Sequence, residues 1–517
     1  MNRFFRVHTL SLLCLICGLL FAGDVSAQKK KKVNLIHTDE LLFDKNMVDA
    51  QRLIGRVQLE YEGTMFFCDS AYLYSTDDFD AFSNIRIIKG SDFSLTGDIG
   101  HFDKKSSTAT VQNNITLRDK EMTLTTDYLT FNTQSEIATY TGGGKIVSNA
   151  NRNTLTSNRG SYHSKSEVFY FRKNVVLKNP DYVVNCDTMQ YNNASEVTYF
   201  FGPTTITGDD SEIYCENGYY NTIKDQSRFG KNARVRSEKT ILTGDSIFYD
   251  GKAGFGEVFR NVTIQDTTQD FSISGNYGKH IEKTKLSFVT QRALLTQFFE
   301  NDSLFLHADT LKALPDSAGK NVIYAYHKVR MFKSDMQGKC DSLVYSESDS
   351  TMLMFRDPVL WNMQNQITGD SISLQIENGQ LHNLLVKGNS FIISDAEAKG
   401  DSIKTQNERY NQIKGRKLTG TFFENELRNV YVEGNGQLIF FPTEEKGKAP
   451  VAVGHNKGDC SNINIEIRDR ELTRIRMETE TNSKFSPMKL AGDAIFKLEN
   501  FKWRGDERPV NKDAIFD

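Results

Sequence analysis

Apolar and polar residues alternate with a period of two along most of this chain, and segments with helical periodicity are nearly absent. The alternating segments are rich in Thr, Val, Ile, Phe and Tyr, the residue types that favour strands. Only eight prolines occur among 517 residues. This scarcity fits continuous strand ladders, because proline cannot donate a ladder hydrogen bond. The sequence therefore predicts an all-β fold.

One unit of about 29 residues recurs along the chain, marked by a small residue followed by Asp, Asn or Glu. An apolar residue stands three positions before this anchor, an aromatic residue usually stands four positions after it, and a second strand-like run precedes it. Such a period is typical of repeat proteins, whose units bury their apolar faces only by stacking on neighbours. The anchors are Asp39, Asp69, Asp98, Asp127, Asn158, Asp187, Glu216, Asp245, Asn276, Asp309, Asp341, Asp370 and Asp401.

The alternation of apolar and polar residues shifts by one position at each anchor. Around Asp98, for example, the apolar residues Leu95 and Phe102 are separated by an odd number of positions. In an uninterrupted strand two residues seven positions apart face opposite sides of the sheet. The register is therefore expected to slip at the small residue, as in a bulge or bend, with the carboxylate bonding the backbone groups freed there. Each unit is then a pair of strands bent at a corner. The period leaves open whether one or two strands per unit stack.

The repeat loosens after Asn276, around Leu314–Ser317, and again after Asp401. We interpret the first irregularity as a boundary between two stacks. The expected organisation is a first β-repeat domain over residues 28–275, a second, less regular β-repeat domain over 276–480, and a C-terminal tail or cap over 481–517. The aromatic residues of the tail predict either a docking segment or a cap on the last strand pair.

The first 27 residues have the features of a secretory signal peptide. Arg3 and Arg6 precede an apolar stretch from Leu10 to Phe21, and small residues follow up to Ala27. The apolar stretch is shorter than the roughly 20 residues that a bilayer-spanning helix needs. We therefore expect cleavage after Ala27 and export of the mature chain.

Charge and cysteine content narrow the possible functions. The 63 Lys and Arg nearly balance the 66 Asp and Glu, which argues against nucleic-acid binding because such proteins need a basic surface. Five cysteines remain after the signal peptide, an odd number without zinc-site spacing. A bridge between Cys186 and Cys215 is conceivable in an oxidising compartment if neighbouring repeats stack.

No recognised catalytic motif is present: there is no GxSxG, HExxH or phosphate-binding glycine loop. We expect no enzymatic activity, no catalytic residue, no metal site and no cofactor. Because the aspartates follow the structural period, a glycosidase-type pair of carboxylates would be hidden among them. An exported scaffold, adhesin or glycan-active β-solenoid with a closed core is therefore the alternative.

The segments Phe93–Asp98 and Ile241–Tyr249, following a signal peptide, resemble the OstA/LptA family of lipopolysaccharide-transport proteins. The OstA-like domain also forms the N-terminus of LptD. The resemblance implies a β-jelly-roll trough of stacked antiparallel strands, lining an apolar groove for the acyl chains of lipopolysaccharide. In that family such troughs join end to end to bridge the inner and outer membranes. Since the chain is longer than a typical LptA, two consecutive troughs are expected.

Physical chemistry favours the same function, since each CH₂ removed from water contributes about 0.8 kcal/mol. A carrier that moves several acyl chains through water must therefore offer a continuous apolar lining. The resemblance implies periplasmic localisation with outer-membrane association, and as partners lipopolysaccharide, the inner-membrane and outer-membrane transport components, and a second copy of the chain. The candidate groove residues are Phe43, Leu95, Phe102, Leu124, Phe131, Val184, Tyr191, Ile213, Tyr220, Leu242 and Tyr249.

Overall fold

The computed structural model describes residues 32–43, 49–61, 63–91, 93–119, 122–148, 153–266, 270–377, 380–396, 409–446, 449–468, 471–487 and 496–517. The predicted signal peptide and the anchor Asp401 lie outside these residues. Within them the only helical segments are two 3-10 helices of three residues each, η2 (Gly505–Glu507) and η3 (Ala514–Phe516). No helix of the described ranges has the length and apolarity needed to cross a bilayer. The predicted all-β fold is confirmed.

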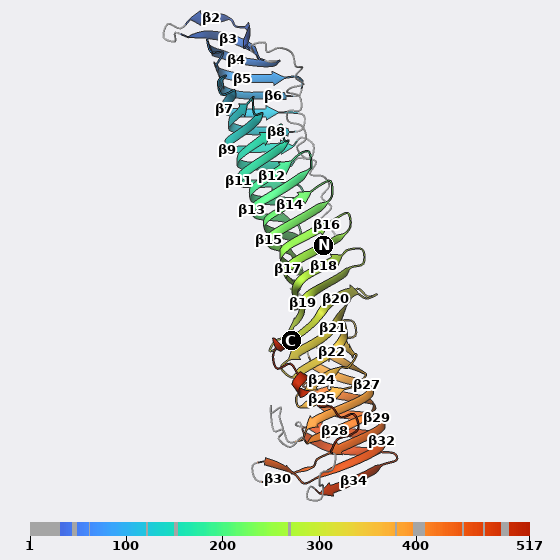
Figure 1. Ribbon diagram of the computed structural model, residues 1–517. Helices are drawn as coiled ribbons and strands as arrows, with labels where there is room; N and C mark the ends of the chain where they lie inside the picture. The colour runs from blue at the N-terminus through green and yellow to red at the C-terminus, as the bar shows by residue number, and fades with distance from the viewer. Residues whose placement is uncertain are drawn as a thin grey trace. The chain divides into compact units, whose positions relative to one another are not determined.

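The chain divides into two compact units. Unit 1 comprises residues 1–238 and 243–256, and unit 2 comprises residues 239–242 and 257–517. Within each unit, consecutive long strands lie side by side in chain order and pair antiparallel (Figure 1). The irregular segment Leu314–Ser317 comprises the last two residues of β20 and the start of the turn to β21, and these two strands pair with each other.

The strands of unit 1 are β1 (Asn34–His37), β2 (Glu40–Phe43), β3 (Ala50–Tyr61), β4 (Thr64–Tyr74), β5 (Phe79–Lys89), β6 (Phe93–Asp103), β7 (Thr108–Arg118), β8 (Met122–Asn132), β9 (Ile137–Ser148), β10 (Thr154–His163), β11 (Val168–Lys178), β12 (Tyr182–Asn192), β13 (Val197–Gly208), β14 (Ser211–Asn221) and β15 (Gln226–Ser237). The unit boundary falls within β16 (Thr240–Asp250) and β17 (Phe255–Asp266).

The strands of unit 2 are β18 (Phe271–Ile281), β19 (Leu286–Phe298), β20 (Ser303–Pro315), β21 (Asn321–Lys333), β22 (Met336–Ser346), β23 (Thr351–Phe355), β24 (Val359–Asn362), β25 (Asn365–Thr368), β26 (Ser371–Glu377), β27 (Gln380–Asp395), β28 (Tyr410–Phe423), β29 (Glu426–Phe440), β30 (Thr443–Lys446), β31 (Ala449–Ala452), β32 (Gly454–Arg468), β33 (Glu471–Glu478) and β34 (Asn482–Pro487).

Each long strand of unit 1 bends once near its middle. The register of β6 against β7 shifts between Thr96 and Ile99, where the anchor Asp98 lies, which confirms the predicted slip. The paired strand β5 shifts between Phe82 and Ile85, so two bent strands make up each repeat. This settles the question that the period left open.

The two strands of a repeat bend at their corners in different ways. One strand has the small residue and acidic anchor, and the other has two successive residues with positive φ, such as Asn113 (64°) and Asn114 (51°). Asn114 donates its Nδ2–H to Asp98 Oδ2 at 2.6 Å, and Asn84 does the same to Asp69 at 2.7 Å. The anchor carboxylate therefore bonds the side chain of the left-handed residue in the neighbouring corner.

The corners divide each bent strand into two halves, which form two walls. We call wall A the halves equivalent to Phe93–Thr96 of β6, and wall B the halves equivalent to Ile99–Asp103. Rings of the two walls touch at Tyr61 and Phe102, with centroids 5.6 Å apart. A single buried cluster in unit 1 contains both Leu95 of wall A and Tyr162 of wall B. The core of each unit thus lies between its walls.

Unit 2 repeats this arrangement with shorter pieces, because its corners interrupt some strands. Wall A contains β24, β25 and residues 390–395 of β27, whereas wall B contains β23, β26 and residues 380–387 of β27. Adjacent residues of β27 point to opposite sides: Ile392 joins the interior cluster, and Phe391 and Ile393 join a separate cluster on the outer face.

Residues 496–517, which we call the C-terminal strap, lie on this outer face of wall A. The side-chain amide of Gln412 bonds both Phe496 O (2.6 Å) and Leu498 N (2.8 Å). Gln366 pairs in the same manner with Lys502 O (2.8 Å) and Arg504 N (2.6 Å). The tail is therefore docked along wall A of its own unit, and the ring of Phe496 also contacts His455 of β32, with centroids 4.9 Å apart.

Candidate functional site

Wall A of unit 1 presents an unbroken row of aliphatic side chains to the interior. The cross-strand pairs run from Leu95 to Leu117, from Leu117 to Leu124 and from Leu124 to Ile146. The row continues through Leu155, Leu177, Val184, Ile206 and Ile213. Because neighbouring strands lie about 4.8 Å apart, such a row is a continuous apolar strip.

Wall B of unit 1 presents a row in which aromatic and small residues mostly alternate. Phe102 pairs with Ala109, Ala109 with Phe131, Phe131 with Ala138, and Ala138 with Tyr162. The row then continues through Phe169, Tyr191, Thr198, Tyr220 and Ser227. Ala109 and Ala138 thus separate the rings of Phe102, Phe131 and Tyr162 along the row.

The structure brings most of the predicted groove residues together in these two rows. Seven of them are buried, with exposed fractions between 2% and 6%: Leu95, Phe102, Leu124, Val184, Tyr191, Ile213 and Tyr249. Phe131, Tyr220 and Leu242 are half-buried. Phe43, at the end of β2, lies in the wall B row as well, paired through Gln51, Leu73 and Phe79 to Phe102, but 75% of its surface is accessible.

One half-buried part of the interior lies around β7 to β9. Ala109, Phe131 and Ala138 are cross-strand neighbours in the wall B row, and all three are only partly covered. In wall A the facing side chains Leu117 and Leu124 are buried. Within unit 1, this stretch of the wall B row is therefore partly exposed to solvent.

Near the corners the interior of unit 1 is filled by side chains. The ring of Tyr140 occupies the space that a Cβ at Gly144 or Gly160 would need, with distances of 2.4 Å from either ideal Cβ position. The Tyr140 hydroxyl lies 2.6 Å from Ser157 Oγ. Burial raises the pKa of Tyr140 to about 12, and the Ser157 bond opposes this shift. The space beside this corner is therefore occupied by the Tyr140 ring.

The interior hydroxyls of unit 1 are neutral at physiological pH. Burial raises the pKa of Tyr182, and the negative charge of Asp181 adds to the shift. Burial likewise raises the pKa of Tyr220, whose hydroxyl donates to Asp225 Oδ1 at 3.1 Å. The lining consequently combines apolar surface with uncharged hydroxyl groups.

The five cysteines of the described residues are free and buried. The conceivable Cys186–Cys215 bridge is thus not formed in this structure. Burial raises the pKa of both thiols to about 12, and the negative charge of Asp187 adds to the shift at Cys186. Four of these cysteines occupy the small position before an anchor, where side chains pack tightly: a Cβ at the equivalent Gly97 would lie 2.5 Å from Val111 Cγ1.

Sequence reasoning missed half of the wall A row. Leu117, Ile146 and Leu177 lie on the strands between the anchors, and each pairs directly with a predicted groove residue or its equivalent. The signal was present, because the runs Asn114–Leu117 and Asn174–Leu177 share one pattern. The small residues Ala109 and Ala138 gave no signal by themselves, since their role depends on the rings beside them.

The interior of unit 2 is more completely covered than that of unit 1. Val386, Leu418, Val432 and Ile463 have no exposed surface. Gly338 interrupts the wall A row, and the methyl group of Met331 fills its place, 2.4 Å from an ideal Cβ there. These interior positions of unit 2 are therefore closed to solvent.

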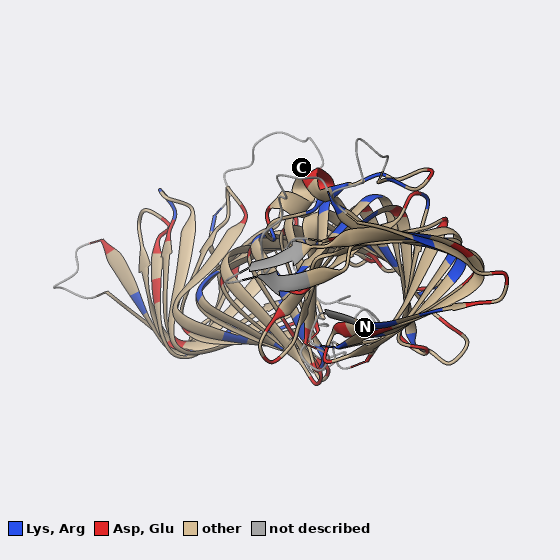
Figure 2. Cartoon of the chain, turned by 90° about the horizontal axis from the view of Figure 1, so that it is seen from below, with Lys and Arg blue, Asp and Glu red and all other residues tan. Residues whose placement is uncertain are grey.

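Charges are distributed without a strong bias toward one sign. Lys and Arg, like Asp and Glu, are scattered over strands and turns (Figure 2). Among the residues that the structure describes, no group of three or more His, Cys, Asp or Glu side chains is placed to hold a metal ion. The described features define an all-β protein of stacked, bent strand pairs around an apolar interior.

The comparisons with known proteins identify the family of the N-terminal part. Residues 30–187 and 181–245 match the family model for OstA-like proteins, which confirms the resemblance predicted from the repeat. The matched residues make up less than half of the chain and fall mainly in unit 1. Residues 30–245 are thus an OstA-like region.

One solved structure similar to this chain is LptH from Pseudomonas aeruginosa, the LptA homologous periplasmic component of the lipopolysaccharide transport device. The sequence identity is 11%, and the alignment covers 28% of this chain and 94% of LptH with a TM-score of 0.20. No curated protein matches the sequence.

Proposed function

We propose that this protein binds lipopolysaccharide in the periplasm, shields its acyl chains between the walls of unit 1, and helps to bridge the inner and outer membranes. The observation that carries the proposal is the pair of facing apolar rows, Leu95 to Ile213 on wall A and Phe102 to Tyr220 on wall B. An exposed chain of a dozen carbons costs roughly 10 kcal/mol in water, so only a continuous lining suits such a cargo.

The accessible stretch at Ala109, Phe131 and Ala138 is the proposed entry for an acyl chain. The OstA-like match of residues 30–245 supports the cargo and the compartment, because the OstA/LptA family consists of lipopolysaccharide-transport proteins. The role is binding and guidance without catalysis. Predicted partners are the inner-membrane and outer-membrane components of lipopolysaccharide transport.

The first strands of the chain support end-to-end association. Within the described residues β1 and β2 pair only with β3, so their other edge is available to a further strand. Leu41, Leu42 and Phe43 expose 42%, 45% and 75% of their surfaces there. Unpaired edges with apolar side chains are templates for strand addition. We assign Phe43, which ends the wall B row, to this contact as well.

Photo-crosslinking in living cells tests the proposal. A photoreactive residue at Phe131 is expected to form an adduct with lipopolysaccharide. A photoreactive residue at Thr130, which precedes Phe131 on the same strand and faces the opposite side, is expected to form none. Phe102 and Tyr249 serve as further interior positions. If none of the three interior positions yields a lipid adduct while the protein accumulates normally, the closed scaffold is the better explanation.

A closed scaffold is also the second candidate, favoured by the fully covered interior of unit 2. In that case both units would be rigid structural elements of an exported protein. The crosslinking at Phe131 separates the two candidates, because a closed core admits no lipid at any interior position.

A further inference from the structure

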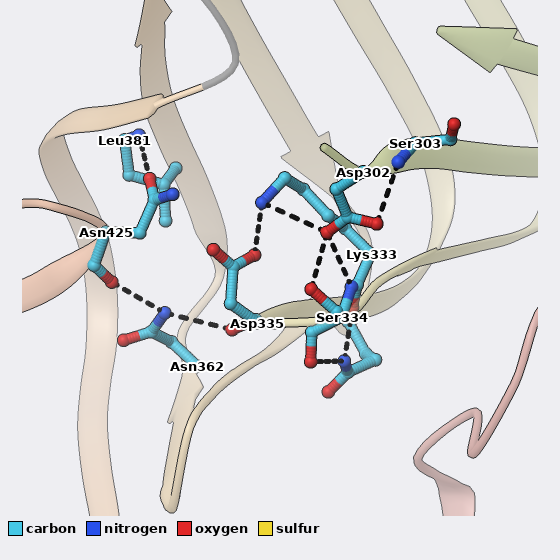
Figure 3. A network of polar contacts seen from close by, with 9 residues as sticks. Asp302, Ser303, Lys333, Ser334, Asp335, Asn362, Leu381 and Asn425 are labelled. Carbon is cyan, nitrogen blue, oxygen red and sulfur yellow. Dashed lines mark hydrogen bonds and ion pairs between the residues drawn. The ribbon is translucent and has the colours of Figure 1, made fainter. Parts of the chain in front are cut away.

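The side chain of Asn362 links the two walls of unit 2 at the strand ends farthest from the corners, which we call the mouth of the interior. Asn362 is the last residue of β24 in wall A, and its Nδ2 donates to Asn425 O at 3.1 Å (Figure 3). Asn425 lies in the turn between β28 and β29, at the far end of wall B. Asn362 has 1% of its surface exposed. The bond therefore closes the mouth of the interior, opposite the corners.

Both sides of this bond are held by further polar contacts. The same Nδ2 of Asn362 donates to Asp335 O at 3.1 Å, in the neighbouring turn of wall A. Lys333 neutralises that turn through ion pairs with Asp335 (2.6 Å) and Asp302 (3.5 Å). On wall B, Asn425 Oδ1 accepts from Leu381 N at 2.7 Å. Two preformed turns thus converge on one amide group (Figure 3).

The C-terminal strap forms hydrogen bonds at the turn that follows Asn362. Arg508 donates from Nη1 to Met363 O at 2.8 Å and from Nε to Gln337 Oε1 at 2.6 Å. Met363 is the residue directly after Asn362. The position of the amide is therefore coupled to the docking of the strap on the outer face.

The closed state carries a built-in penalty. Asn362 Oδ1 is buried and has no hydrogen-bond partner among the described residues. A buried acceptor without a donor is unfavourable, and opening the mouth would hydrate it.

We propose that Asn362 is a latch that holds the interior of unit 2 closed, and that its release admits an acyl chain between the walls. The admission of an acyl chain rests on the proposed function, whereas the latch itself does not. Arg508 is a positioning residue, because it acts on the latch through the backbone of Met363.

The buried cysteines of the full-length chain report the opening of each unit separately. Cys340 and Cys460 belong to the interior cluster of unit 2, and Cys186 belongs to that of unit 1. We expect Asn362→Ala and the isosteric Asn362→Asp to accelerate maleimide modification of Cys340 and Cys460 by about tenfold or more. This is the change expected from losing two ordinary hydrogen bonds. Peptide mass spectrometry measures each thiol, and Cys186 should be unchanged.

A matched control is Asn429→Ala. Asn429 donates to Thr421 Oγ1 at 3.0 Å within wall B, so its loss removes an amide bond without touching the mouth. Arg508→Ala should accelerate Cys340 modification less than Asn362→Ala does. The latch is disproved if both Asn362 variants leave the unit 2 thiols as slow as in the parent, or accelerate the thiols of both units equally through general loss of structure.

The proposed admission of an acyl chain into unit 2 is tested by a separate experiment. A photoreactive twelve-carbon fatty acid should label unit 2 in Asn362→Ala and not in Asn429→Ala. Faster thiol modification without such labelling would overturn the admission of acyl chains. Missing lipopolysaccharide adducts at Phe131, together with faster thiol modification, would instead count against the proposed function and leave the latch standing.

Discussion

At the scale of single residues, the corners of unit 1 show how side-chain chemistry follows backbone geometry. Asn114 has a φ of 51°, a left-handed conformation that costs most L-residues roughly 1–2 kcal/mol. Asn tolerates this conformation, and its amide also reaches Asp98 in the adjacent corner. The anchors were recognisable because they recur with a small neighbour. The role of the asparagines was not, because Asn84, Asn114 and Asn174 recur in the sequence but nothing there shows that their backbone is left-handed or that their amides reach the anchors.

Replacing Asn114 separates these two contributions. Both Asn114→Ala and Asn114→Gly remove the amide bond to Asp98, but glycine accepts a positive φ without strain. We expect the free energy of unfolding of the alanine variant to be about 1 kcal/mol lower than that of the glycine variant. Urea denaturation measures both. Equal stabilities would contradict the assignment of strain to this corner.

The buried thiols predict a fall in stability at alkaline pH. Burial raises the pKa of Cys68 from 9.0 to about 11, so the unfolded chain loses this proton at lower pH than the folded chain does. The stabilisation is complete below pH 9 and is lost as the pH rises toward about 11. Cys68→Ser, which does not titrate in this range, should show a smaller loss between these pH values. Urea midpoints of the parent and the variant provide the measurement.

At the scale of elements, local pattern predicted the strands and their bends, because each depends on residues close in sequence. The pairing of Leu117 with Leu95 and Leu124 follows directly once two bent strands form each repeat. The strap was beyond such reasoning. Gln366 and Lys502 are 136 residues apart, and nothing in the strap's own sequence specifies the glutamines that receive it.

Gln366→Leu should release the strap. This change leaves Lys502 O and Arg504 N without their partner in a buried environment, at a cost of about 2 kcal/mol. Trypsin should then cleave within the strap at least tenfold faster in the folded protein. The control is Gln375→Leu, since Gln375 is exposed and bonds Asn383 outside the strap. Cleavage as slow as in the parent would show that the apolar contacts of Phe501 and Leu498 alone keep the strap docked on wall A.

At the scale of the molecule, repetition converts single contacts into continuous surfaces. One aliphatic residue per strand gives only a contact, whereas the same residue on successive strands gives a strip along wall A. The two units use this repeat differently. In unit 1 part of the wall B row is accessible, and in unit 2 methionines and a polar bridge close the interior. Periodicity predicted the rows in both, but the closure depends on contacts between distant turns.

The gaps in the wall B row of unit 1 give a test of whether the interior holds lipid. Ala138 lies between Phe131 and Tyr162 on the neighbouring strands, so Ala138→Phe would fill the gap with a ring. If the gap receives an acyl chain, lipopolysaccharide crosslinking at Phe131 should fall strongly while the free energy of unfolding stays nearly constant. If the gap belongs to a packed core, the added ring should cost about 1–3 kcal/mol.

The matched control is Thr139→Phe, which adds the same ring to the next residue of β9 on the opposite face. This variant should leave crosslinking at Phe131 unchanged. A strong loss of stability in Ala138→Phe, with crosslinking at Phe131 absent in the parent as well, would mean that the rows seal against each other. Retained crosslinking in Ala138→Phe would instead place the lipid elsewhere along the interior, because a filled gap cannot admit a chain.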